Sequence, residues 1–102
     1  MALSKLDLAF QQAKTRKAII ELLKRVLINR LKLPLEIDEV ADDSPLFGSG
    51  LGLDSVDALE IVVVVEKEFG VSITDDDMQA FRSVNTIVDF IIAKQAEQKE
   101  EQ

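Results

Sequence analysis

The chain has 102 residues, enough for one small domain with a modest core, and its hydrophobic content of 47% excludes a wholly disordered protein. It contains no cysteine and no histidine, which excludes disulfides, the usual zinc sites and Cys–His catalysis. The sequence opens with no charged and then apolar leader, and no uncharged run approaches the length that crosses a membrane. We therefore expect a cytoplasmic protein.

Charge is distributed unevenly along the sequence. The net charge is −7, but residues 1–33 hold eight basic and two acidic side chains, whereas residues 34–102 hold four basic and 17 acidic ones. The acidic part repels nucleic acid and anionic membranes, and it attracts proteins with basic patches. We therefore expect protein partners and neither nucleic-acid nor membrane binding.

The first 33 residues have a helical pattern. Residues 1–13 carry Leu3, Leu6, Phe10 and Ala13, which fits either an extension of the following helix or a short separate helix. From Lys14 to Lys32 apolar residues recur at spacings of three and four: Ile19, Leu22, Leu23, Val26, Leu27 and Leu31. Pro34 ends this amphipathic helix, because its ring prevents continuation.

Residues 34–54 form a long loop with two prolines and three glycines. A loop of this length in a compact domain is usually functional or held by its own apolar residues. Four residues are candidates for holding it: Val40, Leu46, Phe47 and Leu51.

A second helix is predicted from Ser55 to Phe69. Its β-branched run, residues 62–65, favours a strand by propensity, but helix-forming segments flank it on both sides. Ser55 stands where serine is favoured as a helix cap, with its hydroxyl in solvent. The face predicted to turn inward comprises Ala58, Ile61, Val62, Val65 and Phe69.

Two further helices complete the predicted fold. Gly70 ends the second helix, and Thr74–Asp77 fits a capping box that opens a short third helix over residues 75–80. Ser83 caps a fourth helix that ends between Lys94 and Glu97. The result is an all-α, small four-helix bundle over residues 14–97, with an N-terminal extension over 1–13 and a solvated tail over 98–102.

The junction of loop and second helix carries a resemblance to a known family. The sequence Leu51-Gly52-Leu53-Asp54-Ser55-Val56-Asp57 resembles the signature of acyl carrier proteins, followed by the acidic second helix of the bacterial kind. In that family the serine is esterified by 4'-phosphopantetheine, whose thiol carries acyl groups as thioesters. The resemblance implies that Ser55 is the attachment site, next to Asp54, and that a separate phosphopantetheinyl transferase loads it.

The resemblance covers residues 15–95. It includes Phe47, residues 69–71 and residues 89–91 at similar spacings, and it departs at two positions. Val56 replaces the commoner leucine, and Thr74 stands where the family usually has proline. A phosphodiester on Ser55 would meet backbone N–H groups and the positive end of the helix dipole.

The resemblance also implies a docking surface for acyl-handling enzymes on the second helix. Its acids are Asp57, Glu60 and Glu66, and between them lies an apolar stripe of Val56, Leu59 and Val63. Two alternatives remain open for the stripe: exposure for docking, or burial under the loop and third helix. Lys67 falls where many relatives carry an acid, which indicates a different choice of partners.

An apolar interior between the second, third and fourth helices would shelter an acyl chain, as in carriers of fatty acids. The residues that would set its depth are Ile61, Val65, Met78 and Phe81. The cargo is left open: fatty-acid synthesis and a specialised lipid or polyketide pathway both use such carriers.

Other functional classes are weaker. A serine hydrolase lacks the histidine that would act as its base, and we expect no catalytic residues, no dedicated metal site and a monomer. An aminoacyl or peptidyl carrier and an unmodified acidic helical adaptor remain as alternatives.

Overall fold

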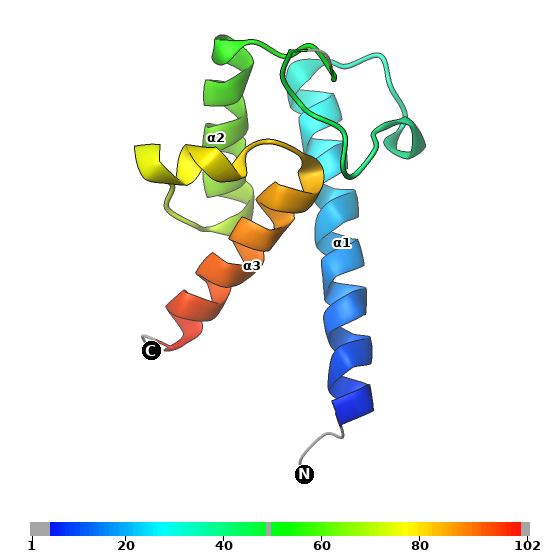
Figure 1. The fold of residues 1–102 in the computed structure, drawn as a ribbon, viewed down its shortest axis with the longest axis vertical. Helices are drawn as coiled ribbons and strands as arrows, with labels where there is room; N and C mark the ends of the chain where they lie inside the picture. Colours follow the sequence, from blue (N-terminus) through cyan, green and yellow to red (C-terminus); the bar gives the residue numbers. More distant parts are fainter. Residues whose placement is uncertain (1–4, 49, 101–102) are drawn as a thin grey trace.

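The computed structural model describes residues 5–48 and 50–100, and side chains within residues 14–48 and 50–98. Residues 1–4 of the predicted extension, including Leu3, and residues 101–102 of the predicted tail lie outside this range. The elements are three α-helices, α1 (Lys5–Leu31), α2 (Ser55–Phe69) and α3 (Val84–Glu100), and two 3-10 helices, η1 (Ile37–Glu39) and η2 (Asp75–Ala80). The described residues contain no strand, and the predicted helical bundle is confirmed (Figure 1).

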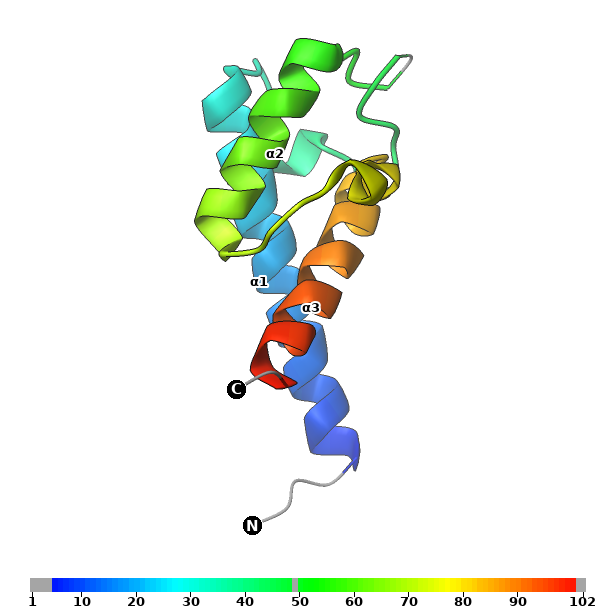
Figure 2. The same ribbon diagram turned by 90° about the vertical axis from the view of Figure 1, so that its left-hand side faces the viewer.

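The core forms where α1 packs against both α2 and α3 (Figures 1 and 2). Each helix contributes side chains that are almost completely buried, and Phe81 and the loop residues Val40 and Leu46 close the core. The helical contributors are Leu23 and Leu27 from α1, Ile61 and Val65 from α2, and Val84, Ile87, Val88 and Ile91 from α3. The helical spacing predicts most of these positions, but Leu22, which it placed on the apolar stripe of α1, is exposed, and Val64, outside the predicted inward face of α2, is buried.

The β-branched run of α2 is helical, as predicted, although its propensity favours a strand. Ile61, Val64 and Val65 are buried on this helix, and such tertiary burial outweighs a propensity cost of a few tenths of a kcal/mol per residue. Gly70 ends the helix in the left-handed conformation, and its N–H donates to the carbonyl oxygen of Glu66 at 3.0 Å.

Both ends of the bundle differ from the simplest reading of the sequence. α1 is continuous from Lys5, so residues 5–13 extend the first helix and project past the end of α3 (Figures 1 and 2). α3 continues to Glu100, so residues 98–100 are helical where a solvated tail was expected. Gln95 and Gln98 donate side-chain hydrogen bonds to the carbonyls of Phe69 and Gly70, at 3.3 and 3.0 Å, and thereby occupy acceptors at the end of α2.

The long loop is held by apolar and polar contacts. Val40 and Leu46 are buried as predicted, Phe47 and Leu51 are partly buried, and Leu53 is a buried position that the prediction omitted. η1 is a further element that the sequence pattern did not indicate; it is closed by a hydrogen bond from Glu36 N to the side chain of Glu39 at 2.9 Å.

A lysine on α1 and an asparagine on α3 hold the loop in place. The largely buried ammonium of Lys24 pairs with Asp42 at 2.5 Å, and the Asn85 N–H donates to the Asp42 carbonyl at 2.9 Å. The Asn85 side chain donates to Asp43 and accepts from Arg16 at 2.8 Å. One asparagine on α3 therefore joins the loop to α1.

Lys32 ends α1 in an unfavourable conformation. Its φ is +53°, and the N–H of Leu33 donates to the carbonyl of Ile28 at 3.0 Å, the pattern of a Schellman cap. Glycine usually occupies this position, because the left-handed region costs a residue with a Cβ roughly 1 kcal/mol.

Replacing Lys32 with glycine should therefore stabilise the protein by about 0.5–1 kcal/mol, measured as the free energy of unfolding in urea. Lys32→Ala is the matched control, because it removes the same charge and keeps the strain. Equal stabilities of the two variants would contradict the assignment of strain to Lys32.

Candidate functional site

The N-terminus of α2 is capped by Asp54. Its backbone is extended, and its carboxylate accepts hydrogen bonds from the N–H groups of Val56 and Asp57, both at 3.0 Å. The Asp57 carboxylate in turn accepts from the Asp54 N–H at 3.0 Å, which completes a capping box. The prediction that Ser55 is the cap was therefore wrong, because the carboxylate one residue earlier already fills that role.

Ser55 is consequently the first residue of α2 and is exposed. No side chain or backbone group among the described residues forms a hydrogen bond with its hydroxyl. The helix dipole still directs its positive end to this position. The sequence analysis expected backbone N–H groups here to meet a phosphodiester on Ser55. The N–H groups of Val56 and Asp57 are not free for that contact, because both already donate to Asp54.

The hydrogen bonds to Asp54 favour its charged form. The N–H of Asp57 is the largest cause, and together with that of Val56 it holds the pKa of the Asp54 carboxyl below its usual value of 3.8. On η2, the Thr74 N–H likewise lowers the pKa of Asp77, whose carboxylate accepts from the Thr74 N–H at 2.9 Å and from its hydroxyl at 3.0 Å. The predicted capping box of the third helix is thus present.

The apolar stripe of α2 is exposed. Val56, Leu59 and Val63 are 64%, 68% and 44% accessible, so the alternative of burial under the loop and the third helix was wrong. Such a group of large apolar side chains at the surface is typical of an interaction site.

The acids beside the stripe also have intramolecular contacts. Asp57 belongs to the cap, and Glu66 accepts a hydrogen bond from the N–H of Ile73 at 2.9 Å, which fixes the segment between α2 and η2. Glu60 lies 3.7 Å from the guanidinium of Arg30 on α1. Of these contacts, only the one between Glu60 and Arg30 joins residues distant in sequence, and the signature around Ser55 gives no sign of it.

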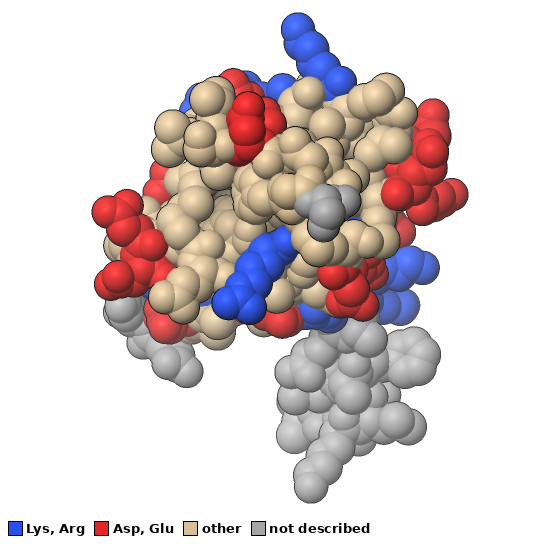
Figure 3. Space-filling model, turned by 45° about the horizontal axis from the view of Figure 1, so that its top comes forward, with Lys and Arg blue, Asp and Glu red and all other residues tan. Residues whose placement is uncertain are grey.

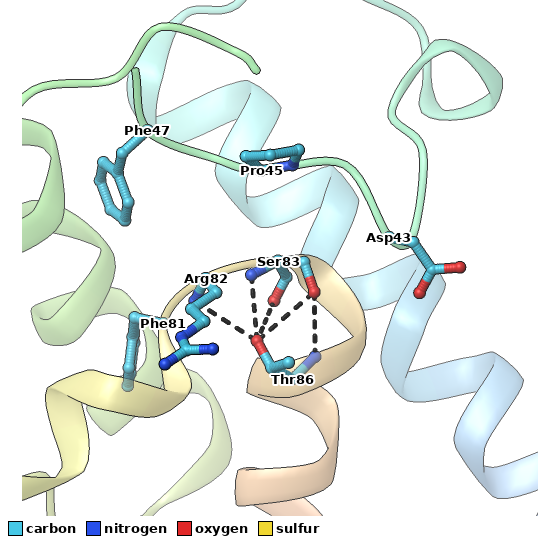
Figure 4. A pocket seen from close by; sticks show the side chains of 7 residues that line it. All are labelled: Asp43, Pro45, Phe47, Phe81, Arg82, Ser83 and Thr86. Atoms are coloured by element: carbon cyan, nitrogen blue, oxygen red, sulfur yellow. Dashed lines mark hydrogen bonds between the residues drawn. The ribbon is translucent and has the colours of Figure 1, made fainter. Parts of the chain in front are cut away.

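A cavity of about 560 Å³ lies between the loop and the start of α3 (Figure 4). It is lined by Asp43, Pro45, Phe47, Phe81, Arg82, Ser83 and Thr86. Of the residues predicted to bound an acyl chain, Phe81 lies here, whereas Ile61 and Val65 are buried in the core and Met78 packs against it. The structure therefore does not bring these four together in this cavity, and their role stays a prediction.

The glycine-rich loop is shaped by a close backbone approach. A Cβ on Gly50 would lie 1.6 Å from the carbonyl oxygen of Pro45, which accepts the N–H of Leu51 at 3.1 Å. Glycine is therefore required at this position for the close packing of the loop.

Comparisons with known proteins agree on one family. The family model described as "Phosphopantetheine attachment site" matches residues 17–91. The chain is 35% identical to an acyl carrier protein of Nitratidesulfovibrio vulgaris (76% of this chain, 99% of that one) and 37% identical to one of Phytoplasma australiense (72% and 92%). The chain belongs to the acyl carrier protein family.

Solved structures show the same fold. The acyl carrier protein of Enterococcus faecalis superposes with a TM-score of 0.63 at 28% identity, over 78% of this chain and 96% of that one. The holo acyl carrier protein NE2163 of Nitrosomonas europaea gives 0.64 at 24% identity, over 76% and 95%. The family's prosthetic group is 4'-phosphopantetheine, and its members act as carriers.

The described residues contain neither a helix long and apolar enough to cross a membrane nor a cluster of three or more metal-ligating side chains. The Ser55 side chain can accommodate the family cofactor, because the residue is exposed and its hydroxyl forms no hydrogen bond with the described residues.

Replacing Asp54 with asparagine removes the charge that these hydrogen bonds favour. Because the folded pKa is lowered, the carboxylate stabilises the protein above pH 3.8, and this contribution is lost as pH falls through the lower folded value. Urea unfolding from pH 7 to pH 2 measures the free energy of unfolding of both proteins. Wild type should be more stable than Asp54→Asn at neutral pH, and the two stabilities should converge in acid. A gap that stays constant down to pH 2 would contradict the lowered pKa.

Proposed function

We propose that Ser55 is the attachment point of 4'-phosphopantetheine and that the protein carries acyl intermediates for fatty-acid, specialised lipid or polyketide synthesis. The observation that carries this proposal is the exposed hydroxyl of Ser55 at the first turn of α2, released from capping by Asp54. The hydroxyl accepts the phosphopantetheinyl group from coenzyme A, and the adenosine bisphosphate portion leaves. When attached, the group supplies a thiol that binds acyl groups as thioesters.

The chain's own residues position this chemistry. The capping bonds of Asp54 and Asp57 fix the backbone of the first turn of α2, so Ser55 occupies a defined position at the surface. The protein needs no base of its own, because a separate transferase with its metal ion activates the hydroxyl. In this proposal it is a carrier on which partner enzymes act, and catalysis is theirs.

We also propose that the exposed face of α2 docks these partners. Its apolar members Val56, Leu59 and Val63 offer contact area, and the neighbouring acids Asp57, Glu60 and Glu66 attract basic patches. Two of these acids also hold the fold, and Arg30 partly neutralises the third. The backbone N–H donors leave Asp57 and Glu66 charged, so the ion pair with Arg30 lowers only the charge that Glu60 offers to a partner.

The working compartment and the monomeric state predicted from the sequence stay predictions. The aminoacyl carrier and the unmodified adaptor differ from this proposal in an observable way. An adaptor would remain unmodified, and an aminoacyl carrier would hold an amino acid on the thiol, so the mass of protein isolated from its source distinguishes the three.

Incubation with coenzyme A and a phosphopantetheinyl transferase should add the mass of one phosphopantetheine to wild type and nothing to Ser55→Ala. Because Ser55 is not the cap, the variant's free energy of unfolding should stay within about 0.5 kcal/mol of wild type. Intact-mass spectrometry and urea unfolding measure the two quantities. A modified Ser55→Ala, or a wild type that no transferase loads, would contradict the assignment.

The docking surface is tested by Leu59→Ser and Glu60→Gln. We expect kcat/KM of the transferase to fall by about fivefold or more for Leu59→Ser, since loss of an important interface contact costs over 1 kcal/mol, and to fall less for Glu60→Gln. Leu22→Ser is the matched control, because Leu22 is an exposed leucine on α1. If Leu22→Ser and Leu59→Ser behave alike, the stripe on α2 is not the docking surface.

A further inference from the structure

The cavity beside α3 combines an apolar wall with a charged group. Pro45 and Phe47 enter from the loop, and Phe81 faces them from the segment after η2 (Figure 4). Ser83, Thr86, Asp43 and Arg82 supply its polar atoms. The question is which of these polar groups is available to a ligand.

The hydroxyls of Ser83 and Thr86 are already used in the cap of α3. Thr86 Oγ1 accepts from the N–H of Ser83 at 3.0 Å and donates to the Ser83 carbonyl at 3.0 Å, and the Thr86 N–H donates to Ser83 Oγ at 3.3 Å. Asp43 accepts from the side chain of Asn85, and its carboxylate points away from Phe47 and Pro45 (Figure 4). These groups serve the fold.

Arg82 differs from them. Its backbone is engaged at both ends, because its N–H donates to Thr86 Oγ1 at 3.3 Å and its carbonyl accepts from Leu46 at 2.8 Å. Within the described part of the chain, no group accepts a hydrogen bond or forms an ion pair with its guanidinium, which lies between Phe81 and Thr86 (Figure 4). A fixed backbone thus presents an uncommitted guanidinium at the edge of an apolar cavity.

The cavity is close to the start of α2. Phe47 pairs with Leu53 in an isolated bridge, and the N–H of Leu53 donates to the carbonyl of Leu46 at 3.1 Å. Leu53 precedes Ser55 by two residues. A flexible arm attached to Ser55 therefore begins beside the Phe47 wall, and the end of that arm can return to the cavity.

We propose, building on the function assigned above, that this cavity holds the acyl cargo and that the cargo carries a second carboxylate, paired with Arg82. Guanidinium matches carboxylate through paired hydrogen bonds. A saturated chain ending in methyl would contact Phe47 and Phe81 but gain nothing from the arginine. The half-thioester of a dicarboxylic acid contacts the apolar side chains through its methylenes, and the carboxylate at its far end pairs with the guanidinium of Arg82.

The surrounding charge supports this choice. The face seen from the top of the bundle is mainly uncharged, and Asp and Glu gather at its edges (Figure 3). The lining holds one basic group, Arg82, and one carboxylate, Asp43, which accepts from the neutral amide of Asn85 and points away from Phe47 and Pro45 (Figure 4), so the only attraction for an anion in the lining comes from Arg82. Arg82 is exposed, so the pair lies at the solvent edge of the cavity and contributes as a surface ion pair, while the methylenes contact the apolar side chains.

The test loads wild type and Arg82→Gln with two coenzyme A thioesters of equal length, octanoyl and the half-thioester of octanedioic acid. The measured quantity is the rate at which an added small thiol cleaves the protein-bound thioester. Cleavage of the octanedioyl thioester should be about two- to fivefold slower in wild type than in Arg82→Gln, the factor expected of an exposed ion pair. The octanoyl thioester should be cleaved at equal rates in both.

Arg25→Gln is the matched control, because Arg25 is an exposed arginine on α1 outside the cavity lining, and it should leave both rates unchanged. The NMR signal of the Arg82 side-chain N–H in wild type is an independent readout, and it should shift with the octanedioyl group and not with octanoyl.

Equal octanedioyl cleavage rates in wild type and Arg82→Gln, or an unmoved Arg82 signal, would overturn the inference while leaving the carrier function intact. If neither thioester loads, the assignment of Ser55 is contradicted instead. Intact mass shows whether the protein was loaded, and so distinguishes a failed assignment of Ser55 from a failed role of Arg82.

Discussion

The hydrogen bonds from the first turn of α2 to the carboxylate of Asp54 are the interaction on which the site depends. A helix start leaves N–H groups unpaired, and some side chain or water must accept them. Because Asp54 accepts two and Asp57 returns a third bond to the Asp54 N–H, the start of the helix is satisfied without Ser55. The serine hydroxyl is thereby left exposed at a rigid position, as a covalent attachment point requires.

The loop before α2 places Asp54 at the start of that helix, and contacts with other parts of the chain fix the position of the loop. Prolines and glycines alone would leave the loop with many conformations. Lys24 on α1 and Asn85 on α3 restrict it by binding Asp42 and Asp43, and the buried side chain of Leu46 holds its centre. The cap and the cavity therefore belong to the same constrained segment, so the proposed cargo site lies near the proposed attachment site.

The charge asymmetry of the sequence has a structural counterpart in these contacts. The basic first helix pairs with the acidic remainder at three points: Arg16 with Asp89 at 2.6 Å, Lys24 with Asp42, and Arg30 with Glu60. The pairs of Arg16 and Arg30 lie at the surface and contribute little stability each, about 0–1 kcal/mol, whereas Lys24 is largely buried; together the three pairs orient α1 against the loop, α2 and α3. The Arg30–Glu60 pair also reduces the negative charge on the exposed face of α2, the face proposed to dock partners.

The sequence by itself determined the features that short-range patterns encode. Helical spacing and caps predicted α2 at Ser55–Phe69 and η2 at residues 75–80, and the residues around Ser55 identified the family. Tertiary structure decided the rest, because it depends on contacts between distant residues. Glu60 on α2 pairs with Arg30 on α1, and Gln98 on a longer α3 reaches Gly70.

The cap of α2 shows where that division lies. Asp54 and Ser55 are both good cap residues, and only the backbone angles set by the folded loop select the aspartate. The lining of the cavity likewise joins residues 43–47 with residues 81–86, which no local pattern relates. Local sequence fixes the conformation of a segment, whereas the long-range packing of the loop against α1 and α3 fixes which groups remain free.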